Sequence, residues 1–139
     1  MFWQASAGSR NSLCYNGDLV YVQDIQRFAR EFPQVDRVMI GRGLLRNPGL
    51  VREAVQGIAL DKKTLREYHD QIYEAYQEVL YGDRNILFRM KELWCFMGSL
   101  FEDPKKYIKK IQKSQRLSEY EQAVEGLFTQ REFEEKMRR

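Results

Sequence analysis

The chain has 139 residues, of which 43% are hydrophobic and 31% charged, and its formal net charge is +3. This composition is typical of a folded protein and excludes a disordered or low-complexity chain. The sequence has no apolar run of the roughly 18 residues that a membrane span needs and no signal-peptide pattern. We therefore expect a cytoplasmic protein without a membrane partner.

Residues that often carry catalysis are scarce. The chain has one histidine, His69, and two cysteines, Cys14 and Cys95, and none of them belongs to a close Cys/His cluster. This pattern argues against a zinc site and against a Cys/His nucleophile pair. We therefore expect no catalytic residue and no metal ligand, two buried thiols, and a histidine on a helix surface.

The first part of the chain alternates short apolar runs with glycine turns. Residues 1–12 have neither helical nor strand periodicity, and we expect them to be irregular. Residues 13–60 predict a strand at 13–15, a helix that ends before Pro33, a second strand at 37–40 and a second helix. This order is a βαβα unit.

Residues 61–139 form a predicted helical domain, because glycine becomes rare and apolar residues recur at intervals of three and four. The pattern indicates about four helices joined by short connections, which favours a compact bundle. Gly98 lies in the second of these helices, where the missing side chain lets a neighbouring helix approach closely. The predicted fold class is thus an α/β unit followed by an all-α bundle.

Two glycine motifs directly follow the two predicted strands. They are Asn16-Gly17-Asp18 and Gly41-Arg42-Gly43, and their first glycines are 24 residues apart. If the strands are parallel neighbours, both turns lie at one edge of the sheet, where backbone N–H groups can hold a phosphate. Arg42 could add a cationic contact or support the loop. For the Asn-Gly pair alone, a tight turn that needs a positive φ is the favoured explanation.

A basic segment lies in the third predicted helix. It has five lysines within nine residues and no acidic residue between them, and Arg116 extends it. The lysines are Lys105, Lys106, Lys109, Lys110 and Lys113. A lysine run is usually a solvated face, but it can also bind nucleic acid. Arg89 and Lys91 on the preceding helix are further candidates for phosphate contacts.

These motifs resemble those of the flavin-dependent tRNA-dihydrouridine synthases. The resemblance lies in Tyr15-Asn16-Gly17-Asp18, in Met39-Ile40-Gly41-Arg42-Gly43 with Asn47-Pro48, in Arg89-Met90-Lys91-Glu92-Leu93-Trp94, and in the stretch from Lys105 to Phe128. It implies that residues 13–60 are the last βαβα of a TIM barrel and that residues 61–139 are a helical tRNA-binding domain.

The resemblance also implies cofactors and roles. In that family the glycine motifs bind the FMN phosphate, which gives this role to Gly17, Gly41 and Arg42, with Asn16, Asp18 and Gly43 as further candidates. NADPH reduces the flavin, the flavin delivers a hydride to a uridine of tRNA, and a cysteine donates the proton. That cysteine belongs to an earlier barrel segment, and Cys14 does not match it.

Two parallel strands cannot close a barrel, so their edges and apolar faces need a cover. We expect these 139 residues to be inactive alone, as a C-terminal portion of such an enzyme, and to self-associate or to meet a partner at the open edge. Two alternatives stay open. One is a stand-alone helical RNA-binding module, and the other is a helical protein-interaction domain that binds no RNA.

Overall fold

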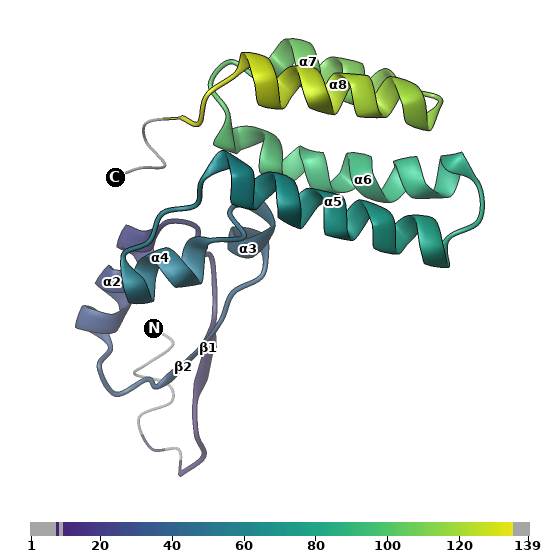
Figure 1. The fold of residues 1–139 in the computed structure, drawn as a ribbon. Coiled ribbons are helices and arrows are strands. Elements are labelled where there is room, and N and C mark those ends of the chain that lie inside the picture. Colours follow the sequence, from purple (N-terminus) through teal and green to yellow (C-terminus); the bar gives the residue numbers. More distant parts are fainter. Residues whose placement is uncertain (1–7, 9, 135–139) are drawn as a thin grey trace.

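The computed structural model describes residue 8 and residues 10–134, and its N-terminal part contains a small parallel sheet. Strand β1 (Cys14–Asn16) pairs in parallel with strand β2 (Arg37–Met39), and helix α2 (Val22–Glu31) connects them (Figure 1). Asn16 lies opposite Met39 in the register. The predicted order of strand, helix and strand is confirmed, and the carboxyl ends of both strands lie at one edge.

Two short helices follow β2, of which the sequence predicted only one. The unexpected helix is α3 (Arg42–Arg46), which begins inside the second glycine motif. The expected one is α4 (Leu50–Gln56), which ends at Gly57 in a left-handed conformation with φ 70°. Asn47 is buried, and its Oδ1 accepts a hydrogen bond from the backbone N–H of Gly49 at 2.9 Å. Asn47 therefore fixes the turn between the two helices.

The C-terminal part consists of four α-helices in two hairpins, and a single 3₁₀ turn at Gly98–Leu100 connects the hairpins (Figure 1). The first hairpin is α5 (Lys62–Val79) with α6 (Asp83–Met97), and the second is α7 (Lys105–Lys113) with α8 (Leu117–Gln130). Within the described residues the number of these helices matches the expected four, and their arrangement as a compact bundle stays a prediction. TIM-barrel architecture is not visible in a two-stranded sheet and stays a prediction.

One hydrophobic core joins these four helices. Its largest fully buried side chains are Trp94, Tyr120 and Phe101, and further core residues come from every helix of the two hairpins. Gly98 allows α7 to approach the end of α6 closely, as predicted. A Cβ at this position would lie only 2.8 Å from Cδ1 of Ile108. A small residue at this position thus sets the spacing between the hairpins.

The two parts of the chain are packed against each other. Helix α3 lies against α6, and Leu60 packs on the helical core. Lys62 begins α5, and its Nζ donates to the carbonyl groups of Phe128 and Arg131 at 3.1 Å each, at the end of α8. A cation at this place satisfies carbonyl groups that have no partner within the helix.

Three predictions of burial are wrong. Cys14 and Cys95 are exposed, because β1 belongs to a sheet of only two strands and Cys95 lies on the outer face of α6. His69 was expected on a helix surface, but it is buried at 2% exposure. The face of α5 that meets the core carries Leu65, His69 and Tyr73, and the partly buried Tyr68, Ile72 and Tyr76 pack beside it.

Candidate phosphate corner and nucleic-acid interface

The two glycine motifs meet at the carboxyl ends of β1 and β2. Arg42 Nη2 in the second motif donates to Asp18 Oδ1 in the first, at 2.6 Å. Gly43 packs so tightly against the backbone carbonyl of Leu19 that a Cβ at position 43 would collide with this oxygen. The contacts therefore bring together two loops that are separated by 24 residues in the chain. We call residues 16–18 and 41–43 the phosphate corner.

The three glycines of the phosphate corner are in different surroundings. A Cβ on Gly41 would meet nothing within 4 Å, so space is open above this backbone. A Cβ on Gly17 would collide with the ring of Tyr15, which folds over it. Among the described residues, only Gly57 and Gly82 are glycines with positive φ. A turn that needs a positive φ is therefore not the reason for Gly17.

The phosphate corner has the features that an anionic group needs. Backbone N–H groups of the second motif lie at the start of α3, where they have no partner within the helix, and the space above Gly41 is open. Arg42 is exposed and paired with the exposed Asp18, so one of its nitrogens supports the loop while its other donors stay available. The residues present thus fit the phosphate end of a bound cofactor.

The lysines of α7 and Arg116 form a continuous exposed surface, which we call the α7 lysine face. All five lysines and Arg116 are exposed. Four of them, with small and polar residues of α8, line a hollow of about 630 Å³. The lining lysines are Lys106, Lys109, Lys110 and Lys113. Helices α7 and α8 approach closely here, because a Cβ on Gly126 would lie only 2.7 Å from the ring of Tyr107.

The two basic candidates on α6 differ in their surroundings. Lys91 is half-buried, and its Nζ donates to the carbonyl of Ser114 at 2.6 Å, so it ties α6 to the end of α7. Arg89 is exposed and lies 3.6 Å from Glu92 in an ion pair of one helical turn. Arg89 therefore keeps donors for a ligand, whereas Lys91 has a partner inside the protein.

Comparison with known proteins identifies the family. The family model described as "Dihydrouridine synthase (Dus)" matches residues 9–138. The chain belongs to the dihydrouridine synthase family. No curated protein matches the chain significantly. Dihydrouridine synthases are oxidoreductases of tRNA processing that generally depend on FMN.

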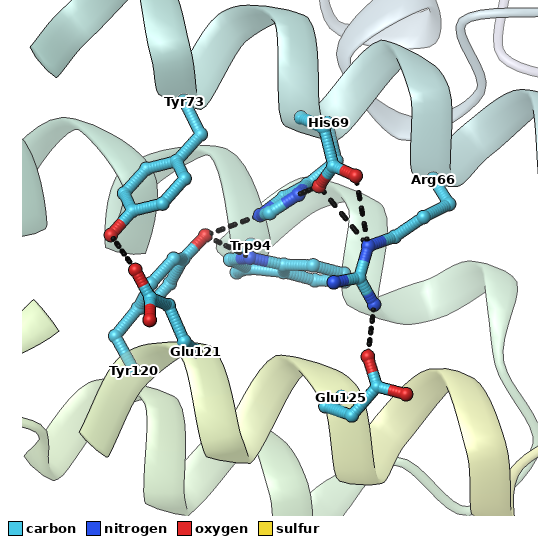
Figure 2. Close-up of polar contacts among 8 residues, drawn as sticks. Arg66, His69, Tyr73, Trp94, Tyr120, Glu121 and Glu125 are labelled. Atoms are coloured by element: carbon cyan, nitrogen blue, oxygen red, sulfur yellow. Dashed lines mark hydrogen bonds and ion pairs between the residues drawn. The ribbon is translucent and has the colours of Figure 1, made fainter. Parts of the chain in front are cut away.

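This dihydrouridine synthase chain also contains a buried polar network that sequence reasoning missed (Figure 2). Trp94 Nε1–H donates to the Tyr120 hydroxyl at 2.9 Å, and this hydroxyl lies 2.6 Å from His69 Nε2. His69 Nδ1 lies 2.8 Å from Asp70 Oδ1. These partners define a neutral imidazole that donates to Asp70 and accepts from Tyr120.

Burial governs the protonation of this network. Burial lowers the pKa of His69 below its usual 6.5, while the hydrogen bond to Asp70 acts in the opposite direction. Burial also raises the pKa of Tyr120 and, with the hydrogen bond to Glu121 as a second cause, that of Tyr73. All three side chains are therefore uncharged near neutral pH, and the network holds α5, α6 and α8 together.

A second layer of this network lies nearer the surface. Arg66 donates to Asp70 at 3.1 Å and to Glu125 of α8 at 2.8 Å (Figure 2). Its guanidinium lies 5.1 Å from the ring centre of Phe128. Local sequence patterns carry no signal for the contacts between helices, because His69 and Tyr120 are 51 residues apart and Arg66 and Glu125 are 59 residues apart. The network connects three helices of this member of the dihydrouridine synthase family.

Within residue 8 and residues 10–134, no group of three or more His, Cys, Asp or Glu side chains is arranged to hold a metal ion. No helix of this same part is long and apolar enough to cross a membrane.

Proposed function

We propose that this chain takes part in the NADPH-dependent reduction of uridine to dihydrouridine in tRNA. Residues 13–60 are the last βαβα of a TIM barrel and contribute the phosphate end of an FMN site. Residues 61–139 are a helical domain that binds the tRNA. Family membership supports the reaction, and the phosphate corner and the α7 lysine face support the two roles.

At the phosphate corner, backbone N–H groups of Gly17, Gly41 and Arg42 bind the FMN phosphate. The open space above Gly41 supports this role, and the Asp18–Arg42 ion pair keeps the two loops at a fixed separation. Asn16 is exposed beside the first loop, where it can donate a further hydrogen bond. Bound FMN supplies the hydride chemistry, and the residues of this chain bind and orient its phosphate end.

The observation that carries the tRNA role is the concentration of exposed lysines on α7. Lys110 and Lys113 lie in the last turn, where the helix dipole favours cations. Lys105 and Lys106 lie in the first turn, where the dipole disfavours cations, and the first turn has no acidic residue. Lys105 with Lys109 and Lys106 with Lys110 are like-charged pairs four residues apart, which destabilise a helix. A polyanion bound to this face offsets these unfavourable charges.

Charge reversal on the α7 lysine face tests this role. The variant replaces three lysines by glutamate: Lys106, Lys109 and Lys110. We expect weaker tRNA binding and a smaller dependence of affinity on salt, because each lost phosphate contact reduces the slope of log K against log [salt] by about 0.7 to 0.9. Filter binding at several salt concentrations measures both quantities.

The control variant replaces three other exposed cations by glutamate, so its net charge changes by the same amount. These residues belong to the α/β part and to α5: Arg30, Arg37 and Lys63. If the control weakens binding as much as the first variant, only overall charge matters and the assigned surface is wrong. If the unaltered chain binds no RNA even at low salt, the helical domain serves protein contacts instead, which is the alternative function.

We propose that these 139 residues alone do not reduce uridine. The phosphate corner contacts one end of FMN, and the catalytic cysteine of the family has no match at Cys14. Measurable formation of dihydrouridine by the isolated chain, with FMN, NADPH and tRNA supplied, would contradict this proposal. Val38 and Met39 on β2 are 40% and 56% exposed, which supports a cover by another strand or by a second copy.

A further inference from the structure

An aromatic side chain on α6 is exposed beside a second basic hollow. Phe88 is 67% exposed, and it lines a hollow of about 490 Å³ between the start of α6 and the connection from α7 to α8. The other lining residues are Arg84, Asn85, Leu87, Lys91, Ser114 and Gln115. We call this the Phe88 hollow.

The chemistry of the Phe88 hollow matches a nucleotide base. Its lining has two cations and no carboxylate, and the guanidinium of Arg89 lies 5.9 Å from the centre of the Phe88 ring. Unpaired bases stack on aromatic rings and on arginine planes. Asn85 and Gln115 supply carboxamides, which can both donate to and accept from the edge of a base.

The Phe88 hollow is continuous with the α7 lysine face. Ser114 lines both hollows, and the Lys91–Ser114 hydrogen bond of 2.6 Å holds α6 and the end of α7 together at this place. A nucleic-acid strand whose phosphates lie on Lys109, Lys110 and Lys113 therefore reaches the Phe88 hollow in its next few nucleotides.

We propose that the Phe88 hollow binds an unpaired base of an RNA whose backbone lies on the α7 lysine face. This inference rests on the proposed tRNA binding and adds a contact that needs a single-stranded nucleotide. Positive charge favours RNA as the occupant over an apolar protein segment. A base-paired helix stays outside the hollow, because its bases are stacked on each other and are not available to Phe88.

The test compares two RNA probes with the full chain. One probe is a short single-stranded oligouridylate with one 2-aminopurine, whose fluorescence is quenched when the base stacks, and the other is an RNA duplex of the same length. We expect Phe88→Ala to weaken single-strand binding about ten-fold and to abolish the quenching, because stacking on one aromatic residue contributes this much. Duplex affinity stays unchanged, and Phe88→Trp preserves both affinities.

Tyr81→Ala is the matched control, because Tyr81 is an aromatic residue with 96% exposure that does not line the hollow. We expect it to leave both affinities unchanged. Phe88 is exposed, so its replacement does not disturb the core, and circular dichroism checks this for each variant.

Three results would overturn the proposal. If Phe88→Ala changes neither affinity, or reduces both equally, while the lysine variant still loses binding, the base contact is wrong and the tRNA role stands. If Tyr81→Ala has the same effect as Phe88→Ala, the contact is not specific to the hollow. If the unaltered chain binds neither probe, the tRNA role and the base contact both fail.

Discussion

Removal of a single oxygen tests the buried network most directly. Tyr120→Phe keeps the aromatic ring, so the packing of the core is preserved, but it deletes the hydroxyl that connects α8 to α5 and α6. This hydroxyl accepts from Trp94 Nε1 at 2.9 Å and donates to His69 Nε2 at 2.6 Å. Tyr120, His69 and Trp94 are all buried, so their polar groups depend on one another for hydrogen bonds.

The expected loss follows from the two groups left without partners. A buried donor or acceptor that loses its hydrogen bond costs about 1–3 kcal/mol. Trp94 Nε1–H and His69 Nε2 share one oxygen, so their costs do not simply add, and we expect a combined loss of about 2–4 kcal/mol. That loss is a large part of the free energy of unfolding of a typical domain, which is roughly 5–15 kcal/mol.

Urea unfolding followed by circular dichroism measures this loss. The matched control is Tyr73→Phe, because the Tyr73 hydroxyl donates at 2.8 Å to Glu121, an exposed side chain that water can solvate. We expect the control to lose about 1 kcal/mol or less. If Tyr120→Phe costs no more than Tyr73→Phe, with the same m-value, the network does not stabilise the helical part and the reasoning fails.

Three further predictions concern stability. Gly43→Ala should lower the melting temperature, because the new Cβ collides with backbone and overpacking costs about 1–3 kcal/mol, whereas Gly41→Ala meets open space and should leave the melting temperature unchanged. The folded state lowers the pKa of His69, so the unfolded state binds more protons. The contribution of neutral His69 to the free energy of unfolding is therefore fully present above pH 6.5 and is lost as the pH falls below this value. Urea titrations of a His69→Gln variant at several pH values should lack this decline. Lys62→Met should cost about 1–2 kcal/mol in urea unfolding through its lost bonds to the end of α8, whereas the exposed Lys63→Met should be neutral; equal effects would contradict this.

The local patterns of the sequence predicted the elements well. The short apolar runs before the glycine motifs predicted both strands, and the apolar periodicity predicted the four helices of the C-terminal part. Helix α3 was missed, because Gly-Arg-Gly-Leu-Leu-Arg is short and rich in a residue that disfavours helices. Parallel pairing alone predicted that the two glycine loops lie close together. Whether the Arg42 side chain supports the loop could not be read from the sequence, and the structure shows that it does so through Asp18.

The errors lie where distant partners decide burial. His69 has a polar ring, and periodicity alone favours an apolar neighbour for the core face of α5. The structure buries His69 because Asp70 satisfies one ring nitrogen and Tyr120 the other, and Tyr120 is 51 residues away. No local pattern contains that information. The same reason explains Lys91, which looked like a free cation in the sequence but donates to Ser114 across two helices.

The arrangement of the helical part joins these observations. Helix α7 has two lysines in its first turn, where the helix dipole disfavours them, and other contacts hold it in place: Gly98 and Gly126 allow close packing on both sides, and Lys91 binds the carbonyl at its end. The buried network then fixes α8 on α5 and α6. These contacts support α7 on the rest of the helical part. A surface that must present several lysines at fixed spacing to a polyanion requires such a support, because lysine side chains are flexible and their backbone positions determine which phosphates they reach.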